Sequence, residues 1–232
     1  MQDAAQSFHS MHMGDKPCGS VPQLAAFSFH ETKNISCGEG GALIVNMPEL
    51  VERAQFLQEK GTDRNLVLKG VKNKYRWIDL GSSFLLSDIL AAMLLAQLEH
   101  VHDIVNERNK TTLAYRDLFG PYDDKKCLQI PKIPVGVKLN HHAFFVIFDT
   151  ENNQQEFLSL LRAKRIFAYI GYMPLHSSPM GRKFGYKPED VPLTEDIAGR
   201  IVRLPFYTEL ASNGLDYCIE RMSEVLRILY GF

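Results

Sequence analysis

The chain has 232 residues, of which 45% are hydrophobic, and a formal net charge of −1 at neutral pH. This composition allows a sizeable core, and it lacks the basic excess that marks a nucleic-acid-binding face. The most apolar stretch, residues 84–98, contains Ser87, Asp88 and Gln97. It is therefore shorter and more polar than a membrane span of about 20 apolar residues, and we expect a soluble protein.

The first 120 residues predict two strands and two helices. Short apolar segments at 25–29 and 42–46 have the composition of strands, and a glycine-rich loop separates them. A helix is expected over residues 48–60, with a proline in its first turn and a glycine after its end. After a loop at 79–83, apolar residues spaced near 3.6 predict one long helix over 85–119, ended by Gly120-Pro121.

The second half alternates strands with helices. The expected elements, in chain order, are a strand at 142–148, a helix at 154–163, a strand at 166–170, a loop at 174–192, a strand at 202–204 and a helix at 214–229. This alternation is typical of an α/β protein. A boundary within 120–140 divides the chain into expected domains 1–125 and 126–232.

Cysteine and histidine positions give no sign of a metal site. The four cysteines lie far apart, without a C-x-x-C pair, and we interpret them as reduced thiols of a cytoplasmic protein. The N-terminal residues lack the charged flank and apolar run of a signal peptide. His141 and His142 are adjacent, and neighbouring side chains on a strand point to opposite faces.

Lys33 is the residue with the most specific chemical surroundings. A lysine amine forms a Schiff base with an aldehyde, but it needs a site that deprotonates it and a cofactor held beside it. Asp3 offers a carboxylate that can keep a pyridine nitrogen protonated, and Gln6 follows it at a distance suited to a ring hydroxyl. Ser28 offers a hydroxyl for a phosphate, and the glycines of 38–41 let backbone pass close to a ligand.

These segments resemble the DegT/StrS-type family of sugar aminotransferases. The matching stretches are Asp3-Ala-Ala-Gln6, Phe27-Ser-Phe-His-Glu-Thr-Lys33-Asn and Gly38-Glu-Gly-Gly41. One branch of the family, which makes dTDP-4-amino-4,6-dideoxygalactose from the 4-keto sugar nucleotide for bacterial surface glycans, is similar also at residues 59–64, 75–83 and 174–176. The similarity covers nearly the whole chain.

The resemblance implies the pyridoxal-phosphate aminotransferase fold of the aspartate-aminotransferase type and a role for each residue. Lys33 would bind pyridoxal 5'-phosphate covalently and move the proton at the sugar C4, with glutamate as amino donor. Asp3 would pair with the ring nitrogen, Gln6 with the ring oxygen and Ser28 with the phosphate. Related dehydratases carry histidine at the lysine position, so lysine at position 33 favours amino transfer over dehydration or isomerisation.

Substrate and partner contacts are less sharply indicated. Tyr172 and His176 match a family segment near the sugar-nucleotide pocket, and a loop histidine bound only to backbone is the equal alternative. His30 lies near Lys33 and either packs or serves the site. Active sites of the family lie between subunits, so a homodimer is expected. In the loop that approaches the partner's cofactor phosphate, many members have an asparagine where this chain has Phe84-Leu85. Ser82 or Ser83 is the substitute that the resemblance offers for this contact.

Family members carry a long portion before the Asp-Ala-Ala-Gln segment, with much of the large domain's sheet and a phosphate-binding loop. The sequence therefore predicts an incomplete large domain followed by a complete small C-terminal domain. Two hypotheses remain open at this stage. The chain is either the lysine-bearing part of a working 4-ketosugar aminotransferase, or a non-catalytic remnant that folds without binding the cofactor.

Overall fold

The computed structural model describes residues 1–12 and 14–232, which form two compact units. The first unit contains residues 1–102 and 135–140, and the second contains residues 103–134 and 141–232. Each is described here by itself. Across these described ranges, no helix combines the length and the apolar character needed to cross a membrane. The domain boundary expected between residues 125 and 126 stays a prediction.

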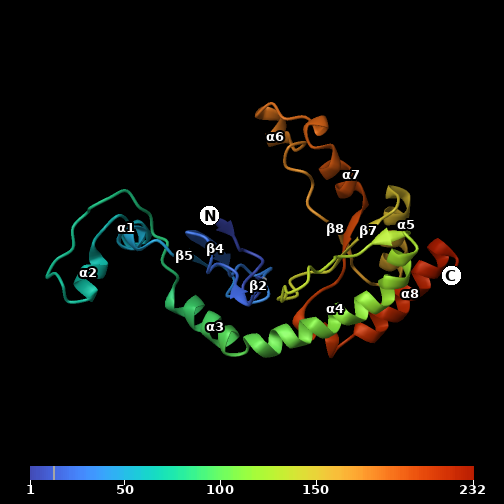
Figure 1. The fold of residues 1–232 in the computed structure, drawn as a ribbon, viewed down its shortest axis with the longest axis horizontal. Coiled ribbons are helices and arrows are strands. Elements are labelled where there is room, and N and C mark those ends of the chain that lie inside the picture. Colours follow the sequence, from blue (N-terminus) through green and yellow to red (C-terminus); the bar gives the residue numbers. More distant parts are fainter. Residues whose placement is uncertain (13) are drawn as a thin grey trace. The chain divides into compact units, whose positions relative to one another are not determined.

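The first unit is built on a small mixed sheet with the strand order β1-β4-β5 (Figure 1). β1 (Gln2–Asp3) is parallel to β4 (Leu24–Ser28), which forms an antiparallel pair with β5 (Gly41–Val45). The strands expected at 25–29 and 42–46 are thus confirmed with a shift of one residue. The remaining elements are β2 (Met11–His12), β3 (Lys16–Pro17), α1 (Pro48–Gln58), α2 (Arg64–Leu68) and α3 (Asp88–Glu99).

Helix α1 begins where the sequence indicates and ends two residues earlier, at Gln58. Pro48 lies in its first turn, and Gly61, with φ of +74°, follows its C-terminal end. A β-carbon at Gly61 would lie 1.7 Å from the carbonyl oxygen of Asp79, so only glycine fits this close passage of two backbone segments. The turn after α1 therefore depends on Gly61 for both its conformation and its packing.

The single helix predicted over residues 85–119 is wrong in two respects. Two helices, α3 and α4 (Val101–Asp124), meet at His100, whose ψ of 16° departs from helical geometry. Helix α4 also continues through Pro121, although proline lacks the amide that a helix interior uses. Packing compensates in this last turn, because Tyr122 stacks on Phe232 at 5.1 Å and donates a hydrogen bond to its carbonyl at 2.9 Å.

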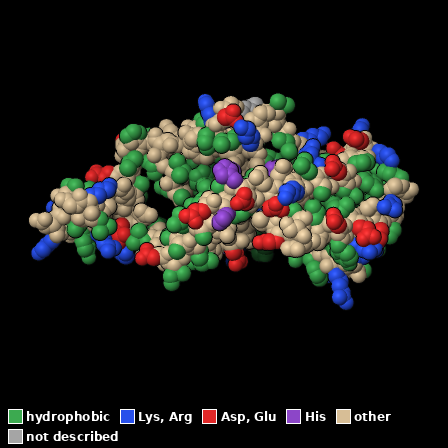
Figure 2. Space-filling view, turned by 90° about the horizontal axis from the view of Figure 1, so that it is seen from below, with side chains coloured by type: hydrophobic (Ala, Val, Ile, Leu, Met, Phe, Trp, Pro, Cys, Tyr) green, Lys and Arg blue, Asp and Glu red, His purple; other side chains and the backbone are tan. Residues whose placement is uncertain are grey.

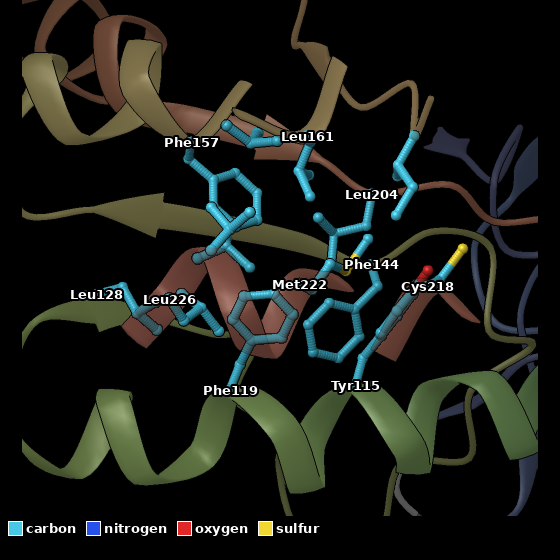
Figure 3. Close-up of a cluster of buried hydrophobic side chains, with 14 of the residues drawn as sticks. Tyr115, Phe119, Leu128, Phe144, Phe157, Leu161, Leu204, Cys218, Met222 and Leu226 are labelled. Atoms are coloured by element: carbon cyan, nitrogen blue, oxygen red, sulfur yellow. The ribbon is translucent and has the colours of Figure 1, made fainter. Parts of the chain in front are cut away.

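The second unit packs helices against a four-stranded antiparallel sheet with the order β6-β7-β9-β8. Figure 3 shows Tyr115 and Phe119 projecting from α4 into the buried cluster that contains Phe144, Phe157 and Met222. The elements after α4 are β6 (Leu128–Gln129), β7 (Phe145–Phe148), α5 (Glu151–Ala163), β8 (Tyr169–Ile170), α6 (Pro179–Lys183), α7 (Pro192–Arg200), β9 (Ile201–Arg203) and α8 (Leu215–Tyr230).

Most expected elements of the second half are present, but three boundaries and one loop differ. The strands at 166–170 and 142–148 are shorter than predicted, the helix at 154–163 starts three residues earlier at Glu151, and the loop at 174–192 contains the short helix α6. Thr150 caps α5 by accepting a hydrogen bond from the Asn153 amide. Helix α7 was not predicted at all. It begins at a proline, which is compatible with a first helical turn.

A buried arginine explains why strand β7 starts late. The guanidinium of Arg108 donates hydrogen bonds to the carbonyls of His141 and His142 at 2.9 and 2.7 Å. It also lies 4.7 Å from the ring centre of Phe206, and burial lowers its pKa to about 10. These carbonyls are thus bound to a side chain rather than to a neighbouring strand, and His141 adopts a positive φ of 53°.

His141 should make the second unit less stable as the pH falls. Burial, followed by the charge of Arg108, lowers the pKa of His141, whose Nδ1 lies 3.0 Å from the Thr112 hydroxyl. The pKa of His141 in the folded protein is below its unfolded value of about 6.5. The contribution of His141 to the free energy of unfolding is therefore present above pH 6.5 and is lost as the pH falls through and below that value. In urea unfolding, the free energy of unfolding should fall less between pH 7.5 and 5.5 in His141→Asn than in the wild type. Asparagine is chosen because it tolerates the positive φ of this position. An unchanged pH dependence in this variant would contradict the assignment.

Candidate functional site

The candidate site lies on one face of the β1-β4-β5 sheet. Asp3 pairs with Ala26, and Ala26 pairs with Leu43, so these three side chains point to the same face. Ser28 lies two residues beyond Ala26 on β4 and therefore shares that face, roughly 7 Å further along the strand. Within the unit, the Asp3 side chain is exposed and Leu43 is 53% exposed. The face thus presents a carboxylate and a hydroxyl on either side of small apolar surface.

Lys33 lies in the loop that connects β4 to β5. Backbone hydrogen bonds hold this loop closed: the Phe29 amide donates to the Gly40 carbonyl at 2.8 Å, and the Glu31 amide donates to the Gly38 carbonyl at 2.7 Å. The Lys33 amide donates to the His30 carbonyl at 2.9 Å. Over residues 1–12 and 14–232, no hydrogen bond or ion pair engages the Lys33 amine. Its backbone is therefore fixed while its amine is available.

Asp3 and Gln6 follow β1 directly. One carboxylate oxygen of Asp3 accepts a hydrogen bond from the Ala5 amide at 3.0 Å, which turns the chain after the strand. The Gln6 side chain is exposed, and the backbone carbonyl of Gln6 accepts a hydrogen bond from the Asn140 side chain at 2.9 Å. The structure therefore brings Asp3, Gln6, Ser28 and Lys33 into one compact unit.

Sequence reasoning did not identify Asn140 as part of this unit. Its side-chain amide donates to the carbonyls of Gln6 and Phe8, both at 2.9 Å, and its own amide donates to the Ser10 hydroxyl at 3.1 Å. The side chain of Asn34, next to Lys33, donates to the Asn140 carbonyl at 2.5 Å. Asn140 thus links the Gln6 segment to the Lys33 loop.

Tyr172 and His176 belong to the second unit. Tyr172 is 86% exposed, in the segment after β8. The Nε2 atom of His176 lies 2.9 Å from a carboxylate oxygen of Glu195 on α7. Both atoms are buried, and neither has a hydrogen bond within the described ranges, so each has the other as its close polar neighbour. His176 is thus held by a side chain rather than by backbone.

The segment after α1 is ordered around a buried carboxylate. Asp63 is fully buried and accepts from the Lys72 ammonium at 2.6 Å and from the Arg76 amide at 2.5 Å. The hydrogen bond from Lys72, followed by that from Arg76, lowers the pKa of Asp63.

Several side chains that follow this segment are exposed. Ser82 and Ser83 are exposed, and Trp77 is 76% exposed. Figure 2 shows apolar side chains at the surface, among charged ones, on the face that it draws.

The described part of the chain holds no group of three or more histidine, cysteine or acidic side chains arranged for a metal ion. The polar groups on the sheet face have a different chemistry. The carboxylate of Asp3 and the hydroxyl of Ser28 lie on that face, and the first unit also contains the Lys33 amine and the Gln6 amide; together these groups are donors and acceptors for an organic phosphate that carries an aldehyde and a ring nitrogen.

Comparison with known proteins shows the family to which the chain belongs. The sequence profile described as the DegT/DnrJ/EryC1/StrS aminotransferase family matches residues 1–223, and the chain belongs to this family. The aminotransferases of this family depend on pyridoxal 5'-phosphate, and relatives of this chain are named as sugar aminotransferases. The expected family, fold type and cofactor class are therefore confirmed.

Individual relatives are similar over nearly the whole chain. GDP-perosamine synthase of Escherichia coli O157:H7 is 26% identical over 97% of this chain and 57% of its own length. The dTDP-4-amino-4,6-dideoxy-D-glucose transaminase of Shigella dysenteriae is 28% identical over 87% of this chain and 52% of its own. A family aminotransferase from Brucella abortus has a TM-score of 0.79 at 26% identity, over 96% of this chain and 56% of that one. The chain thus spans little more than half the length of these relatives.

The chemistry of Asp3, Ser28 and Lys33, all in the first unit, fits the family's cofactor. Asp3 offers a carboxylate to a protonated ring nitrogen, and Lys33 has a free amine for the aldehyde carbon. The Ser28 oxygen accepts from the His30 amide at 3.3 Å, which leaves its own hydrogen to be donated to a phosphate. The site roles of these residues stay predictions, because they rest on this chemistry and on the family pattern.

Proposed function

We propose that this chain is the lysine-bearing part of a pyridoxal-phosphate enzyme that moves an amino group from glutamate to C4 of a dTDP-4-keto-6-deoxy sugar for bacterial surface glycans. The observation that carries the proposal is the presence of Asp3, Ser28 and the free Lys33 amine in one small sheet and its connecting loop. Two relatives whose names refer to amino-sugar nucleotides support this substrate class.

Each residue has a defined task in this reaction. Lys33 would hold pyridoxal phosphate through its aldehyde carbon and would accept and return a proton at the sugar C4. Asp3 would keep the ring nitrogen protonated, Gln6 would donate to the ring oxygen and Ser28 would donate to the phosphate. When bound, pyridoxal phosphate supplies an electron sink for the carbon that loses its proton. The protein residues thus provide orientation and proton transfer.

Tyr172 and His176 are proposed to contact the sugar nucleotide. The exposure of Tyr172 supports a contact with a flat or sugar ring. The Nε2 atom of His176 faces Glu195, which leaves Nδ1 as the ring atom for a substrate oxygen. The assignment of His176 as a ligand is the weaker of the two, since its side chain is only 12% exposed.

A cytoplasmic homodimer is proposed as the working form. The apolar helix α3 has no buried residue in the single chain, and Ile89 and Met93 on it are 76% and 51% exposed. Contiguous exposed apolar surface of this kind is typical of a protein interface. Partner surfaces that cover α3 therefore belong to the proposed function.

The alternative is a non-catalytic remnant that folds without cofactor. The exposure of Leu43, on the face that carries Asp3, favours this alternative, because an open face offers a bound ring little shelter from water. Sugar dehydration or isomerisation is the third option, and lysine at position 33 argues against it.

A spectroscopic titration separates these functions. Adding pyridoxal 5'-phosphate to the purified chain should produce a visible absorbance band of the lysine-bound cofactor, and Lys33→Ala should abolish it. Lys74→Ala is the matched control, because Lys74 is an exposed lysine of the same unit and should leave the band unchanged. A chain whose spectrum is the same with and without Lys33 would support the remnant and overturn the proposal.

A further inference from the structure

His30 occupies a central position between Ser28 and Lys33. Its backbone amide donates to the Ser28 hydroxyl oxygen at 3.3 Å, and its carbonyl accepts from the Lys33 amide at 2.9 Å. Its ring adds three contacts: Nδ1 lies 3.2 Å from the Thr32 amide and 2.9 Å from the Thr32 hydroxyl, while Nε2 lies 3.5 Å from a carboxylate oxygen of Glu39. All of these residues belong to the first unit.

These contacts define the tautomer of the imidazole. A backbone amide only donates hydrogen bonds, so the Thr32 amide requires an unprotonated Nδ1. In the neutral ring the hydrogen then lies on Nε2, which faces the carboxylate of Glu39. The Thr32 hydroxyl must therefore donate to Nδ1 as well, and the ring acts as the acceptor that closes the turn.

The closed turn has consequences for both neighbours. Two hydrogen bonds close the turn at residues 30–33: the Thr32 amide donates to the His30 ring, and the Lys33 amide donates to the His30 carbonyl. Together they fix the Lys33 α-carbon relative to β4. The Ser28 hydroxyl oxygen accepts a hydrogen bond from the His30 amide, so the hydroxyl hydrogen of Ser28 points away from the turn. His30 thus fixes both the backbone position from which the Lys33 side chain extends and the direction in which the Ser28 hydroxyl donates.

We propose that His30 is a positioning residue that holds Lys33 and Ser28 for a phosphorylated aldehyde and does not itself touch the ligand. This inference rests on the proposed function and deepens it. The acceptor at Nδ1 is the essential feature, and the charge of the ring is not. Asparagine places a carbonyl oxygen close to the Nδ1 position, whereas glutamine reaches one bond further, towards the position of Nε2.

The test compares His30→Asn with His30→Gln in the full chain. The first readout is amide hydrogen exchange of Thr32 and Lys33 without any ligand. His30→Gln should raise the exchange rates of these amides roughly five- to tenfold, as expected for the loss of one hydrogen bond, whereas His30→Asn should keep them near the wild-type rates. The amides of β4 and β5 serve as the folding control, because they should stay protected in both variants.

The second readout is the labelling of Lys33 by pyridoxal phosphate, fixed with borohydride and measured by peptide mass spectrometry relative to the exposed Lys74. His30→Gln should lower the ratio of Lys33 labelling to Lys74 labelling, whereas His30→Asn should keep this ratio near the wild-type value. Equal behaviour of the two variants in exchange would overturn the positioning role. If wild-type Lys33 is labelled no better than Lys74, the proposed function fails, while the exchange readout still decides the role of His30.

Discussion

Phe119→Ala should lower the free energy of unfolding of the second unit by about 3–5 kcal/mol. Phe119 is fully buried, and its ring centre lies 6.3 Å from those of Tyr115 and Phe157 and 6.4 Å from that of Phe144 (Figure 3). Alanine would remove these contacts and leave a cavity between α4 and the sheet. Close-packed interiors relax only partly around such a cavity, so the loss exceeds the transfer free energy of the ring alone.

Urea unfolding of the full chain, followed by circular dichroism, measures this loss. Leu113→Ala is the matched control: Leu113 lies on the same helix but is 52% exposed, so its loss should stay below about 0.5 kcal/mol. Trp77, the single tryptophan, belongs to the first unit, and its fluorescence reports separately on that unit. Similar losses for the two variants would show that Phe119 is not part of a cooperative core.

The strands that carry the site could be predicted because local sequence determines them. Segments 25–29 and 42–46 are short apolar runs bounded by turn residues, and both strands lie within one residue of the prediction. Strand pairing then places Asp3 and Ser28 on one face, a relation that follows from register and not from spacing along the chain. The family resemblance identifies these residues, but it does not predict that they share a face.

The errors arise where distant contacts override local signals. Nothing in the sequence at His100 marks a break, because the apolar pattern continues on both sides. Gly120-Pro121 is a strong stop signal, yet the contact of Tyr122 with Phe232, 110 residues away, keeps α4 helical. Strand β7 is shortened because Arg108 takes two carbonyls that a strand partner would otherwise bind.

The supporting residues of the site could not be found from a pattern. Asn140 binds a carbonyl 134 positions earlier in the chain, a contact that no local pattern indicates. In the sequence it is a single asparagine before two histidines, which are the more obvious candidates for a functional site. The sequence shows His30 only as a neighbour of Lys33, because its role depends on which ring nitrogen accepts from Thr32. Residues that act on backbone groups leave little trace in residue type or spacing, and only the folded turn reveals them.

Asn140→Asp should destabilise the first unit by about 2–4 kcal/mol, although the two side chains have nearly the same shape. The Asn140 side chain is buried and donates to the carbonyls of Gln6 and Phe8. A carboxylate at this position would donate nothing, and it would place a buried negative charge against two carbonyl oxygens. Mildly acidic pH should recover part of the loss, because a protonated carboxyl donates one of the two hydrogen bonds.

Trp77 fluorescence during urea unfolding measures the stability of this unit, and hydrogen exchange of the Ser7 and Ser10 amides, which close turns between β1 and β2, reports on the Gln6 segment. Asn73→Asp is the matched control, since Asn73 is exposed in the same unit and introduces the same charge. If both variants unfold at the same urea concentration, the Asn140 hydrogen bonds are not what holds the segment. If only Asn140→Asp is weakened and its Ser7 and Ser10 amides exchange faster, then the position of Gln6 depends on a residue that follows it by more than half of the chain.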